Sequence, residues 1–147
     1  MAPITFLVAS ILGVIFVYLS ISVTVQRRRT HVSLGDDVGP TKDGQRSSDT
    51  PLLVAIRSQA NFEEYVPFSL ILLGLIEAHG FRTEVVQVLG GALVLARLMH
   101  PIGMGQPVPN FFRAGGILLQ WLVLLVMSVL GAYCILGPLL MAHFSTI

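Results

Sequence analysis

The 147-residue chain is 54% hydrophobic and only 12% charged, with a mean hydropathy of +0.79. Soluble domains carry about 25% charged residues, so this composition excludes an ordinary soluble domain and indicates a membrane protein. The formal net charge is +1, and no basic stripe is interleaved with aromatic residues, so nothing in the chain points to a nucleic-acid partner.

Four segments are long and apolar enough to cross a hydrocarbon layer of about 30 Å as helices. They cover residues 3–25, 52–78, 84–103 and 114–142. The first is too long for the core of a signal peptide, and its basic residues follow it instead of preceding it, so we expect a retained span. We therefore predict one all-α membrane domain over residues 1–147, a bundle of four transmembrane helices.

The loops give the orientation of the bundle. Residues 26–50 are polar, contain Gly, Asp, Ser and Pro throughout and show no periodicity, which predicts a surface loop. By the positive-inside rule, the first and third loops are cytoplasmic because they hold nearly all the basic loop residues. These are Arg27, Arg28, Arg29, Lys42, Arg46 and Arg113, against Arg82 alone in the second loop.

The second segment begins with an unusual polar cluster. A charged side chain at the centre of a span costs roughly 2.5–3.5 kcal/mol, so such residues face a bundle interior or a wet cavity. Arg57, Asn61 and Glu64 are spaced i, i+4 and i+7 and share one helix face, whereas Glu63 points about 100° away from Glu64. We assign Glu64 to a site for a zwitterionic ligand and Glu63 to a partner helix or a neighbouring subunit.

Further polar residues are predicted at the same membrane leaflet. Arg97 and His100 are three residues apart near the cytoplasmic end of the third segment, and Arg113 opens the fourth. Two interpretations are open: the charges neutralise one another between helices, or they line a ligand cavity. The accompanying neutral hydrogen-bonding side chains favour the cavity; they are Gln59, Asn61, Tyr65 and His100.

Other reactive side chains carry less information. Glu77 is expected to be a solvated residue at the membrane interface, and Cys134, in an apolar run, to be an inert buried thiol. The run Arg27–Arg29 is expected to anchor the topology, with a share in ligand binding as the alternative. The remaining histidines have no metal-ligand spacing, so no metal is expected; they are His31, His79 and His143.

The stretch from Arg57 to Pro67 resembles the signature of the MAPEG family, the membrane-associated proteins in eicosanoid and glutathione metabolism. That signature is Arg, Gln at +2, Asn at +4, Glu at +7, Tyr at +8 and Pro at +10, and all six residues occur here in register. The four spans, the long polar first loop and the arginines of the third and fourth spans agree with it. The resemblance covers essentially the whole chain.

The resemblance implies a homotrimer of four-helix subunits that binds glutathione between neighbours near the cytoplasmic face. It implies that Arg113 stabilises the glutathione thiolate, as in the leukotriene-forming members. Two positions depart from the pattern, because Met104 replaces a Tyr of the synthases and Ala114 replaces a frequent Ser. The residues that match glutathione-binding positions are Arg57, Gln59, Asn61, Glu64, Tyr65, Arg97 and His100.

The expected function is that of a glutathione-dependent membrane transferase or peroxidase in detoxification, with glutathione as co-substrate. It would act on hydrophobic electrophiles or lipid hydroperoxides that enter from the bilayer. The alternative is a non-catalytic lipid- or glutathione-binding protein of the same fold, since two hydroxyls are missing. The expected partners are further copies of the chain, membrane lipids and a hydrophobic small molecule. A bacterial inner membrane is expected ahead of the endoplasmic reticulum, with the site on the cytoplasmic side.

Overall fold

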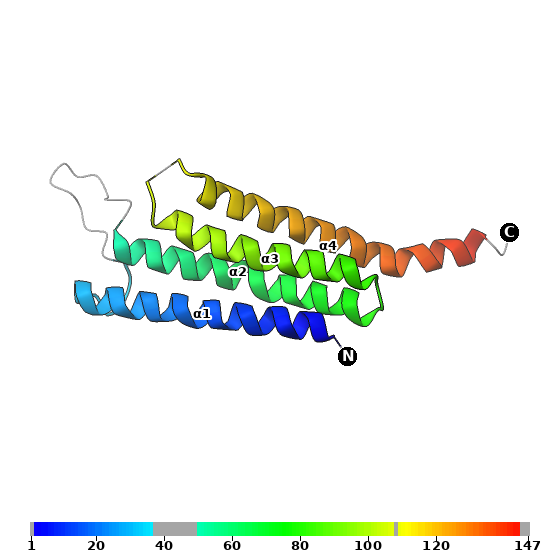
Figure 1. The fold of residues 1–147 in the computed structure, drawn as a ribbon, viewed down its shortest axis with the longest axis horizontal. Coiled ribbons are helices and arrows are strands. Elements are labelled where there is room, and N and C mark those ends of the chain that lie inside the picture. The colour runs from blue at the N-terminus through cyan, green and yellow to red at the C-terminus, as the bar shows by residue number, and fades with distance from the viewer. Residues whose placement is uncertain (1, 37–49, 108, 145–147) are drawn as a thin grey trace.

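Four long helices account for most of the chain. The computed structural model describes residues 2–36, 50–107 and 109–144, with only the backbone at 139–144. The helices are α1 (Pro3–Thr30), α2 (Pro51–Ala78), α3 (Thr83–Met104) and α4 (Phe111–Phe144). They lie lengthwise beside one another, and the described part of the chain contains no strand (Figure 1). The predicted all-α four-helix bundle is confirmed.

The first helix is longer than predicted. It runs to Thr30 and takes Arg27–Arg29 into its last turn, where cations interact favourably with the negative end of the helix dipole. His31 then ends the helix in the left-handed conformation, with φ of 56°. Arg27 donates to three backbone carbonyls just beyond the helix, the shortest bond being 3.0 Å to Gly35. The predicted loop therefore begins at residue 31, and Lys42 and Arg46 lie outside the described residues.

Local capping sets where α2 and α4 begin. Thr50 Oγ1 accepts a hydrogen bond from Leu53 N at 3.2 Å, and Pro51 occupies the first helical position, where its missing N–H costs nothing. Asn110 Oδ1 accepts from Arg113 N at 2.8 Å, so α4 begins at Phe111, three residues before the predicted start. Arg113 consequently lies in the first turn of α4 with its backbone held in place.

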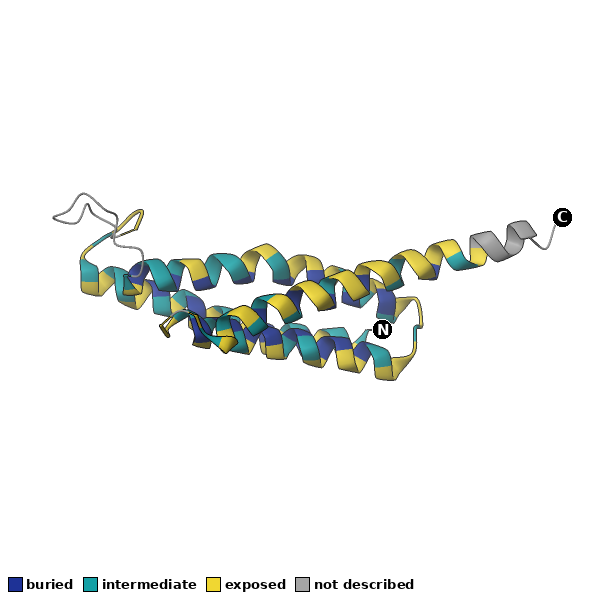
Figure 2. Ribbon diagram, turned by 90° about the horizontal axis from the view of Figure 1, so that it is seen from above, coloured by how far each residue is buried: buried dark blue, intermediate teal, exposed yellow. Residues whose placement is uncertain are grey.

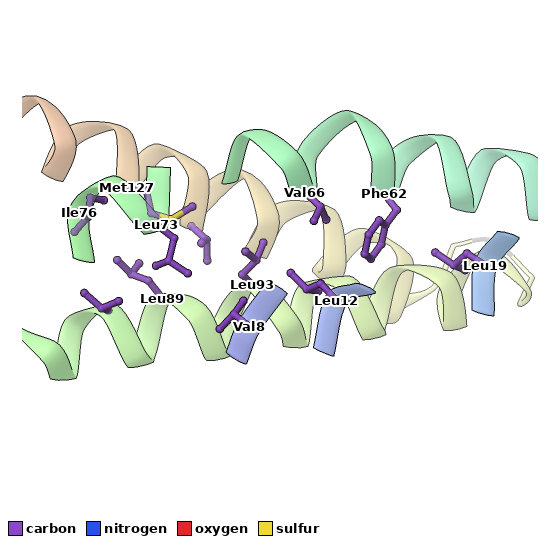
Figure 3. Packing of buried hydrophobic residues seen from close by; sticks show 12 residues of the cluster. Val8, Leu12, Leu19, Phe62, Val66, Leu73, Ile76, Leu89, Leu93 and Met127 are labelled. Atoms are coloured by element: carbon purple, nitrogen blue, oxygen red, sulfur yellow. The ribbon is translucent and has the colours of Figure 1, made fainter. Parts of the chain in front are cut away.

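The apolar core lies along the inside of the bundle and contains side chains from every helix. Leu12 of α1, Leu73 of α2, Leu93 of α3 and Met127 of α4 are each at most 1% exposed, and Figure 3 shows them pointing toward one another. Figure 2 shows that the outward faces of the helices are exposed. These faces are apolar as well, with exposed side chains such as Phe6, at 76%. An apolar exterior of this extent suits lipid and not water.

Among the described residues, three helices are long and apolar enough to span a membrane: α1, α3 and the Phe111–Pro138 part of α4. Helix α2 has the same length as α1, 28 residues, but it is not among these candidates, and its first half carries the charged residues Arg57, Glu63 and Glu64. It packs against all three other helices, so its polar residues are partly covered by protein. The crossing of α2 remains a prediction from the sequence.

Glu77 has a role in the fold that the sequence did not predict. Its carboxylate is half-buried and accepts from Ile4 N at 2.8 Å, Thr5 N at 2.7 Å and Thr5 Oγ1 at 2.7 Å. The first amides of a helix have no intrahelical partner, so a carboxylate beside them satisfies donors and interacts favourably with the helix dipole. Glu77 thus joins the end of α2 to the start of α1, at the end of the bundle opposite Arg57.

Candidate functional site

A cavity of about 340 Å³ lies at the end of the bundle where α2 and α4 begin and α3 ends. Its volume is within the range of about 300–1,000 Å³ that is usual for small-molecule sites. Helix α2 forms one wall, and α3 and α4 form the others. The cavity brings together five of the residues predicted from the sequence, namely Arg57, Asn61, Glu64, His100 and Arg113.

The α2 wall carries a cation and a carboxylate at its two ends. Arg57 and Glu64 are seven residues apart, which separates their Cα atoms by about 10 Å along the helix axis. Both side chains are exposed, and neither forms an ion pair with another described residue. The interpretation in which these charges neutralise one another therefore loses its support within this part of the chain. The wall can hold a ligand that has an anionic and a cationic end.

Arg97 lies behind this wall and does not line the cavity. It is 1% exposed, and its Nη1 donates to Asn61 Oδ1 at 3.0 Å and to Asn61 O at 3.3 Å. Its guanidinium carbon lies 5.8 Å from the centroid of the Tyr65 ring, a cation–π distance. Arg97 Nε and Nη2 are buried and have no hydrogen-bond partner among the described residues. Buried hydrogen-bond donors in proteins are normally paired with an acceptor.

Two of the predicted binding residues point away from the cavity. Gln59 Nε2 donates to Ser20 Oγ on α1 and to Glu63 Oε1, each at 3.2 Å. Tyr65 accepts a hydrogen bond at its hydroxyl from Trp121 Nε1 at 3.3 Å. Helical geometry accounts for the orientation of both side chains, because Gln59 is rotated about 200° from Arg57 around the axis of α2 and Tyr65 about 100° from Glu64. Within one subunit, neither residue reaches the cavity.

Glycines position the α3 and α4 residues of the site. A Cβ at Gly103 would overlap the backbone nitrogen of Arg113, and a Cβ at Gly116 would lie 2.8 Å from His100 N. Asn110 Nδ2 adds a hydrogen bond to Gly103 O at 2.9 Å. The start of α4 is therefore held directly against the end of α3, which fixes where Arg113 and His100 meet the cavity.

Apolar residues complete the lining and were missed by the sequence reasoning. Helical spacing could have found them, because Ala60 follows Arg57 by three residues and Ile117 follows Arg113 by four. The others are Leu53 and Val54; Met104, which the sequence analysis had already singled out, lines the cavity as well. Met104 lies on the cavity wall, so that departure from the family pattern falls inside the candidate site. Ala114, the second departure, is exposed and does not line the cavity.

The basic end of α1 forms a separate feature. Arg27, Arg28 and His31 line an open hollow of about 390 Å³ that contains none of the residues of the first cavity. Over the described residues, no group of three or more His, Cys, Asp or Glu side chains is arranged to hold a metal ion. The chemistry available in the first cavity is thus that of guanidinium, carboxylate, amide and imidazole groups.

Comparison with known proteins relates the chain to a family and to two relatives. Residues 5–133 match the model of the MAPEG family. Inner membrane protein YecN of Escherichia coli strain K12 is 34% identical over 73 residues, which cover 50% of this chain and 55% of YecN. The YecN protein of E. coli O6:H1 strain CFT073 gives the same values. The chain spans about half the length of the curated relatives it matches.

Proposed function

Because this chain belongs to the MAPEG family and is a multi-pass integral membrane protein, we propose that it is a glutathione-dependent membrane transferase acting on hydrophobic electrophiles. Reduction of lipid hydroperoxides is the related activity of the same site. The observation that carries the proposal is the single cavity in which Arg57, Glu64 and Arg113 converge. Glutathione has two carboxylates, one ammonium group and one thiol, and the charges of this cavity complement them.

The residues of the cavity fit the tripeptide group by group. Guanidinium groups bind carboxylates through paired N–H donors, which is the role proposed for Arg57. Glu64 suits the ammonium group, about one and a half helical turns further along α2, and Asn61 between them can hydrogen-bond to the peptide backbone. Arg97 is proposed to hold Asn61 in position from behind that wall. His100 supplies a neutral hydrogen-bonding side chain opposite.

Arg113 is the residue proposed to promote the chemistry. The thiolate is the nucleophile, whereas a thiol with a pKa near 8.5 is mostly protonated at neutral pH. A cation that lowers this pKa by about 2 stabilises the thiolate by about 2.7 kcal/mol. The thiol gives its proton to solvent, the thiolate sulfur forms a bond to the electrophilic carbon, and the leaving group departs with its bonding electrons. With a hydroperoxide, two glutathione molecules form one disulfide while the peroxide is reduced to an alcohol and water.

The location and assembly of the enzyme are parts of the same proposal. The name of the E. coli relative supports a bacterial inner membrane, and the basic residues at this end of the bundle support a cytoplasmic site. A homotrimer with glutathione at the subunit boundaries is implied by the resemblance to the family. The exposure of Arg57 and Glu64 in the single chain supports it, because a neighbouring copy could cover them.

The test is a titration of the purified protein in lipid nanodiscs with glutathione. Calorimetry gives the dissociation constant, ultraviolet absorbance reports thiolate, and chloride release from a hydrophobic aryl chloride reports turnover. Binding with thiolate formation and turnover is the expected result, and failure to bind glutathione would overturn the proposal.

A non-catalytic glutathione- or lipid-binding protein is the second candidate, and one observation favours it. Met104, on the wall of the cavity, presents a thioether where the catalytic members carry a phenol. This candidate predicts that glutathione binds, or that lipid binds in its place, without any rise in thiolate absorbance and without chloride release.

A further inference from the structure

The last turns of α1 and the residues that follow them form the basic hollow of about 390 Å³, which is separate from the candidate glutathione site. Thr24, Arg28 and His31 line it at spacings of i, i+4 and i+7, so they share one face of the helix end. The chain turns at His31, whose φ of 56° is left-handed, and Val32 and Ser33 complete the lining. The hollow is therefore built by the end of the helix together with the turn beyond it.

The two arginines of the hollow have different surroundings. Arg27 Nη1 donates to three backbone carbonyl oxygens within residues 32–35, at 3.0–3.4 Å, so this side chain holds the turn in place. Arg28 is exposed and forms no hydrogen bond or ion pair with another described residue. The described lining contains hydroxyl and imidazole groups and no carboxylate. A guanidinium group in such surroundings suits an anionic group with several acceptor oxygens, such as a phosphate.

An apolar stripe on the outer face of α1 leads directly to the hollow. Val14, Val17 and Ile21 precede Thr24 at steps of three and four residues, so they lie on the helix face that also carries Arg28. The three side chains are 72%, 56% and 56% exposed, and in a membrane this exposure is to lipid. Val14 to Thr24 covers about 15 Å along the helix axis, which is about half of the 30 Å hydrocarbon layer and thus the depth of one leaflet. A molecule with an anionic head and an acyl chain would contact both the hollow and the stripe.

We propose that the hollow binds the phosphodiester headgroup of an anionic phospholipid, with one acyl chain lying along the stripe of Val14, Val17 and Ile21. Arg28 would hold the phosphate oxygens, and Thr24 would donate a further hydrogen bond. Basic pockets at the cytoplasmic ends of transmembrane helices bind lipid headgroups of this kind. A soluble phosphate ester offers the same headgroup chemistry but would gain nothing from the stripe, so the stripe favours the lipid. The inference goes beyond the proposed function and does not depend on glutathione.

Native mass spectrometry of the full chain in detergent, titrated with three probes, tests the ligand class. The probes are dioleoyl phosphatidylglycerol, dioleoyl phosphatidylcholine and glycerol phosphate, and the fraction of protein that retains each probe gives its affinity. We expect phosphatidylglycerol to bind at least about fivefold more tightly than phosphatidylcholine, the effect of one basic side chain near an anionic headgroup. Glycerol phosphate should not be retained at the same concentrations. Equal retention of the two lipids would overturn the inference, and retention of glycerol phosphate as tight as that of phosphatidylglycerol would assign the hollow to soluble phosphate esters instead.

A matched pair of arginine variants in the same helical turn locates the site. Arg28→Ala should weaken the binding of phosphatidylglycerol by about fivefold, and Arg28→Lys, which keeps the charge, should lose less. Arg29 is also exposed but points about 100° away and does not line the hollow, so Arg29→Ala should stay within about twofold of the parent. Far-ultraviolet circular dichroism checks the fold of each variant, and Arg28→Gln repeats the test if Arg28→Ala does not fold. Equal losses for Arg28→Ala and Arg29→Ala would show a general attraction of lipid to the positive charge of α1 and overturn the site. Unchanged lipid binding in Arg28→Ala, together with weaker glutathione binding, would overturn it as well.

Discussion

Arg97 on α3 holds Asn61 on α2 through a 3.0 Å hydrogen bond from Nη1 to Oδ1, and the guanidinium is otherwise buried beside Tyr65. The buried cation is costly to the fold because two of its donors have no partner among the described residues. Asn61, in contrast, faces the cavity. We therefore propose that Arg97 is a positioning residue, which holds Asn61 toward the cavity at a cost to stability.

The substitution Arg97→Met separates these two effects. Replacing a buried charge by an apolar side chain of similar length is often neutral or stabilising, by about 1–4 kcal/mol, so the variant should unfold at the same or a higher temperature. Glutathione binding should weaken by about tenfold, or about 1.4 kcal/mol, because Asn61 loses its anchor. Thermal unfolding and calorimetry in the same nanodiscs measure both. A variant that loses stability and keeps its affinity would contradict this role, and Arg82→Met, exposed between α2 and α3, is the control.

Arg57 and Arg113 are expected to affect different steps. Arg57→Ala should raise the dissociation constant of glutathione by about 10- to 100-fold, the effect of losing a hydrogen bond between charged groups, with little change of kcat at saturation. Arg113→Ala should leave binding within about threefold and lower kcat by about 25-fold at pH 7, because a thiol pKa that returns from about 6.5 to about 8.5 reduces the thiolate fraction by that factor. Calorimetry and chloride release distinguish the two variants. If both variants bind and turn over glutathione like the parent, the glutathione site does not lie in this cavity.

The pH dependence of Arg113→Ala gives an independent check. Without the cation, the pKa of the bound thiol returns upward to its ordinary value near 8.5, so at neutral pH only a small fraction is thiolate. The rate of the variant should then rise about tenfold for each pH unit between pH 6.5 and 8, whereas the parent should be nearly independent of pH over that range. Thiolate absorbance should follow the same curve. Parallel pH profiles for parent and variant would exclude this role of Arg113.

Periodicity and charge were sufficient to predict the four helices and one face of the site. Arg57, Asn61 and Glu64 share the cavity because helical spacing alone fixes which α2 residues point the same way. The same spacing turns Gln59 and Tyr65 away from that face, and they were assigned to the site through the family signature. The location of Arg97 depends on how α3 is rotated against α2, which spacing within one helix does not determine. The hydrogen bonds from the start of α1 to Glu77 likewise join residues more than 70 positions apart. No local sequence pattern predicts a contact of this kind.

Gly116 allows α4 to approach α3 closely, and a larger residue there should lower both stability and activity. An added Cβ would lie 2.8 Å from His100 N, so Gly116→Ala should destabilise the bundle by about 1–3 kcal/mol and displace Arg113 from the cavity. Gly91 on α3 is the matched control because no atom lies within 4 Å of a Cβ added there. Gly91→Ala should leave stability unchanged or raise it by up to about 1 kcal/mol. Equal unfolding temperatures for the two variants would contradict the close contact.

Glu77 should matter for stability and not for the site. Glu77→Ala removes the acceptor for two backbone amides and one hydroxyl at the start of α1, and we expect a loss of about 1–3 kcal/mol in the free energy of unfolding. The amides of Ile4 and Thr5 should exchange with solvent deuterium faster, because they lose the bonds that protect them. Glutathione affinity should not change, since Glu77 is about 30 Å along α2 from Arg57. Glu84→Ala, an exposed carboxylate in the first turn of α3, is the control and should cost no more than about 1 kcal/mol. Slow exchange at Ile4 and Thr5 in the Glu77 variant would show that the amides have another acceptor.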